Sequence, residues 1–574
     1  MKNSATILAM LFTLFSSSLY ADVFASRIRL TNPDDSPFDG KFGDGTDAKI
    51  SYILNDTATA VSVQIIDAST NAVVATINGG AQSRGMNAVV WNGNGSTGGK
   101  KYYVQISATQ NSYSATDYTI FYFQQTGEAI GDPSRGIYTR GVDAVTNMML
   151  PKFGNLYASN ADGGSNTGYK TGVLRYTADG SFYGTSPGHP ILEASLGTAN
   201  GGTFNWSGLA PWYATVDRQG EVYISGNGTA GIVYKMKNDT VAPKAFIGGI
   251  KDPRGLCVVD TGANRKVYIA ADTVVWRVDL GNSDSATAPP VLVASLGLYV
   301  RDVIVDDDGH LIVALRTTGS TAPGYIEHYD LSTGTLPKTR ADADWSASLA
   351  TGLPIGFGLV HGANKNSSED DTLYFSVRGG DNSVIGIWRL TGITGFIEYK
   401  QIIRPTADPR SAGGNISTNA DMTVDYAGNI ILFENGNEEI FMISPPHESA
   451  TNTEVTRSAM EYVVAPSTSV GEQTKIPKEF VLDQNYPNPF NPSTTIGFHL
   501  PVRGKVTVTV YDVLGNLVKE LFVGEADPGY TAVVWNATNN AGMKVSSGMY
   551  LYRLTAQLSD GRVFTDVKRM MLLK

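Results

Sequence analysis

The chain has 574 residues, of which 42% are hydrophobic and 17% charged, so its composition is neither that of a disordered chain nor that of a membrane-embedded one. Its 44 basic and 54 acidic residues give a net charge of −10, which argues against a protein that binds nucleic-acid phosphates. The 62 glycines and 28 tyrosines indicate many turns between short strands, and therefore an all-β protein spread over several domains. The one cysteine, Cys257, excludes an intramolecular disulfide.

The first 21 residues have the features of a secretory signal peptide. Lys2 precedes the apolar run Ile7–Phe15, which is too short to span a bilayer, and small residues lead to Ala21. No later apolar run reaches about 18 residues, the length of a membrane-spanning helix. We therefore expect an exported protein.

Residues 22–130 contain strand-like segments that occur again near the C-terminus. Residues 60–67 align with 505–512, and residues 88–92 align with 532–536. The alternation of apolar and polar residues within these segments predicts a β-sandwich in both places. Both copies resemble the Ig-like domain of flagellar hook-capping proteins, and the resemblance implies an Ig-like fold for each. We expect the N-terminal copy to be a spacer or packing domain.

Residues 131–445 contain a different repeat, in which Val-Asp-x-x-Gly precedes an apolar residue. It is present at residues 216–222, 305–311 and 424–430, and three looser copies occur between residues 152 and 374. The pattern predicts a hairpin whose Asp caps the turn and whose Gly adopts a positive φ. Six copies at spacings of about 40–65 residues predict a six-bladed β-propeller. The repeats resemble those of the NHL class, with wider similarity to gluconolactonase-like propellers.

The mouth of the propeller channel is the predicted ligand site, because the innermost strands of a propeller begin there. The blade pattern places acidic, basic, aromatic and imidazole side chains at those starts. The candidate residues are Asp143, Trp212, Arg254, Asp302, His361 and Asp421.

Two functions from different classes fit these candidates. A binding or surface-interaction protein is favoured, with a carbohydrate or protein ligand and an aromatic platform of Trp206, Trp212 and Tyr213. The alternative is a metal-dependent hydrolase of the lactonase or esterase type, which the resemblance to gluconolactonase-like propellers implies. No cofactor or metal ligand set is predicted, although a divalent cation held by channel carboxylates is left open. The acidic run Asp306–Asp308 is interpreted as a hairpin turn and not as a Ca²⁺ site.

Residues 446–479 are rich in Ser, Thr, Pro and Glu and are predicted to form a linker. Residues 480–574 then begin with a proline-rich stretch, which we expect to lie extended at the edge of a second sandwich. This end resembles the type A C-terminal sorting domain of type IX secretion system cargo. The resemblance rests on the proline-rich box, on Trp535 and on the basic–apolar tail, and the residues assigned to the sorting motif are Tyr486, Pro487, Asn488, Pro489, Phe490, Asn491, Pro492, Lys568 and Arg569.

The resemblance implies export by the type IX secretion machinery, removal of this domain, and attachment of the body to surface lipopolysaccharide. It thus implies a protein that is secreted or held at the outer-membrane surface. The fold expected for the whole chain is thus a six-bladed β-propeller flanked by two Ig-like β-sandwich domains.

Overall fold

A computed structural model describes residues 23–573, except residues 43–46, 112–117, 123–138, 162–170, 182–190, 199–201, 207–208, 307, 318–322, 350–351, 361–370, 379–385, 392–395, 401–418, 435–438, 446–451, 466–479, 486–487, 489, 491, 493, 527–528 and 560. In these residues the secondary structure consists of β-strands and short 3-10 turns, without an α-helix. The predicted signal peptide and the serine-rich part of the predicted linker lie outside the described residues.

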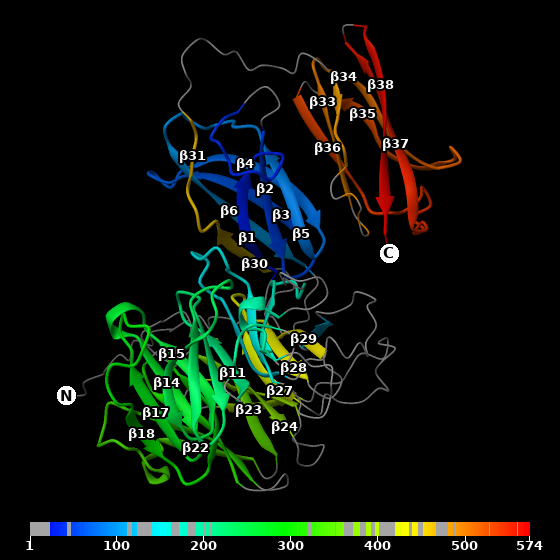
Figure 1. Cartoon of the computed structure of the whole chain (residues 1–574). Helices are drawn as coiled ribbons and strands as arrows, with labels where there is room; N and C mark the ends of the chain where they lie inside the picture. The colour runs from blue at the N-terminus through cyan, green and yellow to red at the C-terminus, as the bar shows by residue number, and fades with distance from the viewer. Residues whose placement is uncertain are drawn as a thin grey trace, which may run out of the picture. The chain divides into compact units, whose positions relative to one another are not determined.

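The middle of the chain forms a β-propeller, which confirms the predicted fold class (Figure 1). The described residues supply six sheets of three or four antiparallel strands, and the innermost strand of each sheet contacts the innermost strand of the next until the ring closes. The sheets are β8 (Thr139–Ala144), β9 (Leu156–Asn160) and β10 (Gly172–Tyr176); β11 (Ala210–Val216), β12 (Val222–Asn227), β13 (Gly231–Met236) and β14 (Lys244–Ile250); β15 (Pro253–Val259), β16 (Lys266–Ala271), β17 (Val274–Asp279) and β18 (Val291–Ser295); β19 (Tyr299–Val305), β20 (Leu311–Arg316), β21 (Gly324–Tyr329) and β22 (Trp345–Leu349); β23 (Leu353–Val360), β24 (Thr372–Arg378), β25 (Gly386–Thr391) and β26 (Phe396–Lys400); and β27 (Asn419–Val424), β28 (Ile430–Glu434), β29 (Glu439–Ser444) and β7 (Thr119–Tyr122).

The Val-Asp-x-x-Gly hairpins have the predicted geometry. In the turn from β11 to β12, Asp217 Oδ1 accepts the backbone N–H groups of Gln219 and Glu221, both at 2.9 Å, and Gly220 has a φ of 72°. Asp306 and Asp425 accept the corresponding N–H groups in the β19–β20 and β27–β28 turns. The aspartate therefore fixes the turn between the two inner strands of a blade.

Strand β7 completes the last blade, although the sequence places it in the N-terminal sandwich. Thr119–Tyr122 pairs with Phe441–Ser444 of β29, so the outermost strand of this sheet comes from before the rest of the propeller. The predicted boundary at residue 130 is therefore too late: the segment at 119–122 finds its hydrogen-bonding partners in a strand more than 300 residues further along the chain.

The N-terminal sandwich has one sheet of β1 (Ala25–Thr31), β2 (Ala48–Leu54) and β5 (Gly85–Trp91). Its second sheet contains β4 (Val73–Gln82), β3 (Ala58–Asp67), β6 (Lys101–Gln110) and β30 (Asn452–Arg457), with β31 (Tyr462–Val463) also paired to β6. The last two strands come from the predicted linker at 446–479. The prediction of a linker is thus corrected for residues 452–463, which extend the sheet of this domain because β6 offers them a free edge.

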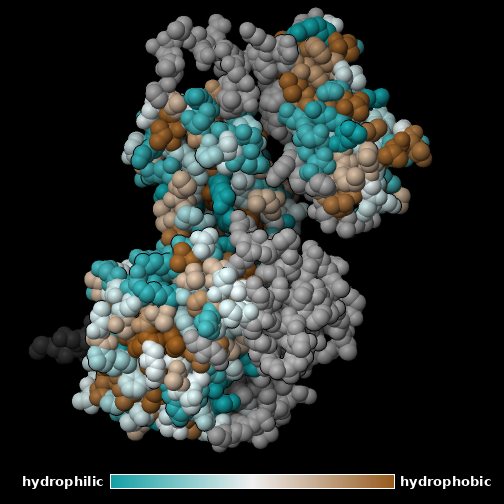
Figure 2. Space-filling view, viewed as in Figure 1, coloured by the Kyte–Doolittle hydropathy of each residue, from teal (hydrophilic) through white to brown (hydrophobic). Residues whose placement is uncertain are grey.

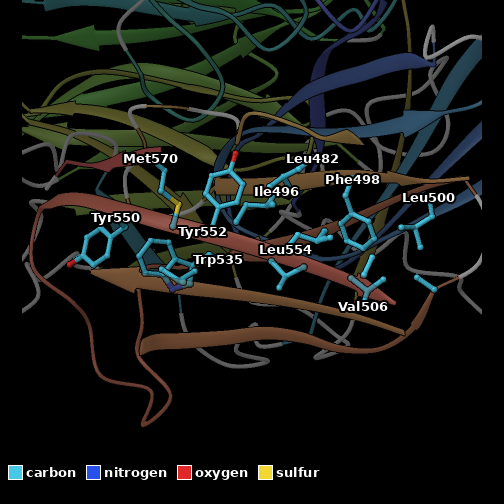
Figure 3. Packing of buried hydrophobic residues seen from close by; sticks show 14 of the residues in the cluster. Leu482, Ile496, Phe498, Leu500, Val506, Trp535, Tyr550, Tyr552, Leu554 and Met570 are labelled. Atoms are coloured by element: carbon cyan, nitrogen blue, oxygen red, sulfur yellow. The ribbon is translucent and has the colours of Figure 1, made fainter. Parts of the chain in front are cut away.

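The C-terminal sandwich has the same strand arrangement. Strands β32 (Val481–Leu482), β33 (Thr494–Leu500) and β36 (Gly529–Trp535) form one sheet, and β35 (Leu517–Ala526), β34 (Gly504–Asp512), β37 (Gly548–Leu558) and β38 (Val563–Leu572) form the other. Figure 3 shows Trp535, Tyr550 and Tyr552 packed among aliphatic side chains of both sheets.

Local contacts also repeat between the two sandwiches. The indole N–H of Trp91 donates to the Asn94 carbonyl, and that of Trp535 donates to the Thr538 carbonyl, three residues along the chain in both cases. Both tryptophans are buried. The internal repeat inferred from the sequence therefore corresponds to one fold used twice.

Candidate functional site

Each innermost strand of the propeller has a β-bulge near its start, so that one or two residues there have no partner across the ladder. The bulges lie between Thr139 and Val142, Pro211 and Tyr213, Pro253 and Leu256, Val300 and Asp302, Ile355 and Phe357, and Asn419 and Asp421. A bulge redirects a side chain away from the regular alternation of its strand. We call these positions the bulge ring; its large side chains are Arg140, Trp212, Arg254 and Arg301.

The bulge ring combines an indole with guanidinium groups. The Cζ atoms of Arg140 and Arg254 lie 4.8 and 5.1 Å from the centre of the Trp212 ring. This is the distance of a cation–π contact, in which a cation lies against an aromatic face.

A second pair extends the positive charge at the same end of the sheets. Arg316, at the end of β20, pairs with Tyr299 at the start of β19, and its Cζ lies 5.1 Å from the Tyr299 ring. Burial and then the charge of Arg316 lower the pKa of Arg254, so these two guanidiniums repel each other. The basic cluster lies in a chain of net charge −10. An anion bound between these arginines would relieve that repulsion.

The candidates Asp302 and Asp421 are buried between the inner strands and do not line an open mouth, and each is 1% exposed. Asp302 Oδ2 accepts the Tyr213 hydroxyl at 3.1 Å and the Phe357 N–H at 3.2 Å. Asp421 Oδ2 accepts the Val142 N–H at 2.7 Å. Both carboxylates therefore connect one inner strand to the next around the ring.

Asp143 has a similar connecting role. Its carboxylate accepts the hydroxyls of Thr215 and Thr423 at 2.6 and 3.0 Å and the N–H of Val216 at 3.0 Å. It thereby joins β8 to the inner strands on either side. Backbone and hydroxyl donors occupy both oxygens of Asp143 and Asp302 and one oxygen of Asp421. The predicted convergence of these carboxylates on a ligand stays a prediction.

Small residues in the bulges make room for these carboxylates. A Cβ added to Gly255 would meet the Cα of Asp302 at 2.6 Å, and one added to Gly356 would meet the backbone nitrogen of Met422 at 2.5 Å. The close approach of neighbouring inner strands explains why glycine occupies these positions.

Protonation of the buried carboxylates should make the propeller more stable at lower pH. Burial raises the pKa of Asp302, and burial together with the charge of Asp302 raises the pKa of Asp421. The folded state then holds a proton that the unfolded chain releases above about pH 4, so stability falls as pH rises from there through the raised pKa values. We expect the free energy of unfolding of the wild type, relative to that of the Asp302→Asn variant, to be lower at about pH 8 than at about pH 5. Urea unfolding at both pH values checks this; a constant difference contradicts it.

The remaining candidates from the sequence are His361 and the residues of the predicted aromatic platform. His361 lies outside the described residues. Trp206 packs in the core against Phe204 and Tyr234, with ring centres 4.8 and 5.2 Å away, and Tyr213 is buried. The predicted aromatic platform is therefore corrected to Trp212 alone. The sequence analysis did not identify Arg140, Arg316 and Tyr299 as candidates. Their positions in the blade pattern could have indicated them: Arg140 and Tyr299 lie at or beside the start of an inner strand, and Arg316 ends the strand that pairs with β19.

The C-terminal sandwich brings together the described parts of the predicted sorting motif. Asn488 Oδ1 accepts the Met571 N–H at 2.8 Å, and the Phe490 carbonyl accepts the Leu573 N–H at 2.9 Å. Phe490 is buried 5.5 Å from the Trp535 ring, while Pro492, Lys568 and Arg569 lie outside the core. Tyr486, Pro487, Pro489 and Asn491 lie outside the described residues.

A family model for the FlgD Ig-like domain matches residues 39–112 and 493–560, which agrees with the two sandwiches and with the predicted resemblance. A search of curated proteins finds no match. In the described part of the chain, no helix is long and apolar enough to cross a bilayer.

Solved structures match this chain at low similarity. An auxiliary nutrient binding protein from Bacteroides thetaiotaomicron has 11% identity and a TM-score of 0.36, over 69% of this chain and 93% of that one. PorZ, a surface component of the type IX secretion system of Porphyromonas gingivalis, has 12% identity and a TM-score of 0.28, over 94% and 76%. A putative gluconolactonase has 9% identity and a TM-score of 0.32, over 58% and 95%. Similarities at this level say nothing about what this chain binds.

Proposed function

We propose that this protein is an exported binding protein whose propeller takes up an anionic ligand at the bulge ring. The observation that carries the proposal is the group of guanidiniums around Trp212, with Arg140 and Arg254 both over its ring. Arginine presents a fork of donors that matches carboxylate or phosphate oxygens, and an indole face packs against sugar rings. The chemistry therefore favours an acidic carbohydrate.

The alternative of a metal-dependent hydrolase at the channel has less support. It needs carboxylates directed at a bound ion or substrate, whereas Asp143, Asp302 and Asp421 accept hydrogen bonds from neighbouring strands. Binding, without a reaction at this site, is the function that the described residues support best.

The proposal includes export by the type IX secretion machinery and residence at the cell surface or outside the cell, with lipopolysaccharide as the anchor. The support is the sorting motif itself, whose box and tail lie side by side through Asn488 and Met571. The C-terminal sandwich also exposes many apolar side chains, some of which are visible as brown areas in Figure 2. Exposed apolar surface of this kind is typical of a domain that another protein recognises.

Binding of acidic polysaccharide tests the ligand half of the proposal. Affinity electrophoresis through polygalacturonate should retard the full chain, dextran should not, and added salt should weaken the retardation. Loss of one charge-assisted hydrogen bond costs about 1.5–3 kcal/mol, so Arg254→Gln should weaken binding about tenfold or more. Trp212→Ala should weaken it further.

Arg277→Gln is the matched control, because Arg277 also lies in the third blade but pairs with Asp279 at 2.7 Å outside the bulge ring. Its mobility should equal that of the wild type. Retardation that survives both bulge-ring substitutions would assign the ligand to another surface.

A further inference from the structure

Two of the six histidines of the chain lie beside a hairpin aspartate, away from the bulge ring. Asp306 caps the β19–β20 turn, His310 ends that turn, and His328 lies on the adjacent strand β21. One ligand atom from each of the three lies within 4.8 Å of the others. Asp306 and His328 are buried, and the His310 side chain is 21% exposed.

The two oxygens of Asp306 have different roles. Oδ1 accepts the backbone N–H groups of Asp308 and His310 at 3.1 and 2.8 Å, as the turn requires. Oδ2 faces both imidazoles and lies 3.4 Å from His310 Nδ1 and 3.4 Å from His328 Nε2. The turn itself uses only Oδ1, and the contact of Oδ2 with His328 Nε2 is a long hydrogen bond of 3.4 Å.

These distances suit a shared metal ion better than hydrogen bonds. A charged N–H···O bond is normally about 2.7–2.9 Å long. In a tetrahedral zinc site with bonds of about 2.0–2.1 Å, adjacent ligand atoms lie about 3.3 Å apart. Nδ1 of His310 is buried and makes no hydrogen bond among the described residues. Asp306 Oδ2 therefore lies at the spacing of a neighbouring metal ligand from each imidazole nitrogen, and all three ligand atoms lie within 4.8 Å of one another.

Each imidazole also has a carboxylate near its other nitrogen. His328 Nδ1 lies 3.3 Å from Asp344 Oδ2, and His310 Nε2 lies 3.8 Å from Asp330 Oδ1. Histidines that bind metals usually direct the second nitrogen at a carboxylate or carbonyl, which fixes the tautomer and makes the ligand more basic. Two such pairs converge on Asp306.

The equivalent hairpins of other blades use these positions differently. In the β11–β12 hairpin, Glu221 and Lys235 occupy the positions of His310 and His328, and an ion pair of 2.7 Å joins them. In the β27–β28 hairpin, Asn429 donates to Asp425 Oδ2 at 2.8 Å. Those two hairpins are closed by direct contacts, whereas the β19–β20 hairpin leaves an oxygen between two imidazoles.

We propose that Asp306, His310 and His328 bind one Zn²⁺ or a similar borderline divalent ion, with water as the fourth ligand. Two imidazoles and one carboxylate are a zinc-type donor set, whereas Ca²⁺ and Mg²⁺ require mostly oxygen ligands. The ion fastens the β19–β20 hairpin to strand β21. His310 is the ligand that solvent reaches, so the ion enters from that side.

Metal titration of the full chain without an affinity tag tests the proposal. After chelator treatment and dialysis, addition of Zn²⁺ should give about one bound ion per chain by mass spectrometry and raise the unfolding temperature. Co²⁺ in its place should give the visible absorption of a four-coordinate site. Equal concentrations of Ca²⁺ or Mg²⁺ should do neither.

The variants His310→Asn and His328→Gln should each lose the ion. His310→Asn places there the residue that the β27–β28 hairpin already contains, so the turn should still form. Asn429→Gln, in that second hairpin, is the matched control and should keep full occupancy. Either the absence of bound Zn²⁺ in the wild type, or unchanged occupancy in both histidine variants, would overturn the proposal and leave a cluster of ion pairs.

Discussion

Replacement of Gly356 by alanine should destabilise the propeller by about 2–5 kcal/mol. Two costs add at this position. A non-glycine residue with left-handed backbone costs about 1–2 kcal/mol, and Gly356 has a φ of 68°. The new Cβ would also overlap Asp421 Oδ1 and approach the backbone nitrogen of Met422 to 2.5 Å. Forcing such an overlap apart costs about 1–3 kcal/mol. Urea unfolding followed by hydrogen exchange of peptides from β23 and β27 measures the change.

Gly297→Ala is the control that distinguishes the cost of the left-handed backbone from the cost of the Cβ overlap. It also has a φ of 68°, but nothing lies within 4 Å of an added Cβ. Gly297→Ala should therefore show the backbone cost alone and remain about 1–3 kcal/mol more stable than Gly356→Ala. Equal stability of the two variants would mean that β23 and β27 can move apart, and that the bulge ring does not depend on their close approach.

Replacement of Trp535 by alanine should destabilise the C-terminal sandwich by about 3–5 kcal/mol, the usual cost of truncating a buried tryptophan. The side chain is fully buried, with the rings of Phe490 and Tyr550 at 5.5 and 5.1 Å and its indole N–H bonded to the Thr538 carbonyl. The loss is a large share of the 5–15 kcal/mol that holds a typical domain folded. Hydrogen exchange of peptides from residues 494–572 should accelerate, while propeller peptides keep their protection.

Val534→Ala is the control for Trp535→Ala. Val534 is the preceding residue and is 62% exposed, so its truncation should change stability by less than about 0.5 kcal/mol. The pair also tests export. If this sandwich carries the sorting signal, Trp535→Ala should reduce the amount of protein at the cell surface and Val534→Ala should not. Normal delivery of a chain whose C-terminal sandwich is unfolded would refute that role.

Local patterns in the sequence were enough to predict much of the fold. The Val-Asp-x-x-Gly repeat identified the propeller hairpins because a turn is set by a few adjacent residues, such as Asp217 and Gly220. The aligned segments around Trp91 and Trp535 identified the duplicated sandwich because buried side chains alternate with exposed ones along each strand. Strands β7 and β30 were misassigned, since short strands gain their place from distant partners that no local pattern encodes.

The candidate site was predicted less well. The sequence placed Trp212 and Arg254 near the starts of inner strands, and the structure groups both with Arg140. It also treated Asp302 and Asp421 as ligand-facing, whereas they are buried and bonded to neighbouring strands. The sequence alone does not distinguish an aspartate that faces a ligand from one that connects inner strands, because the difference lies in its contacts with neighbouring strands.

The propeller is inserted into the N-terminal sandwich. In the C-terminal sandwich, β37 and β38 are joined by a short turn that contains Gly561, but β6 and β30, the corresponding strands of the first copy, are separated by residues 111–451. Gln110 and Asn452, at the two ends of that segment, are direct partners in the ladder. The inserted propeller therefore leaves and re-enters the N-terminal sandwich at adjacent positions of two paired strands, as a hairpin loop does. A lineage could exchange it for another module with neighbouring ends, or lose it, and keep the flanking domains unchanged.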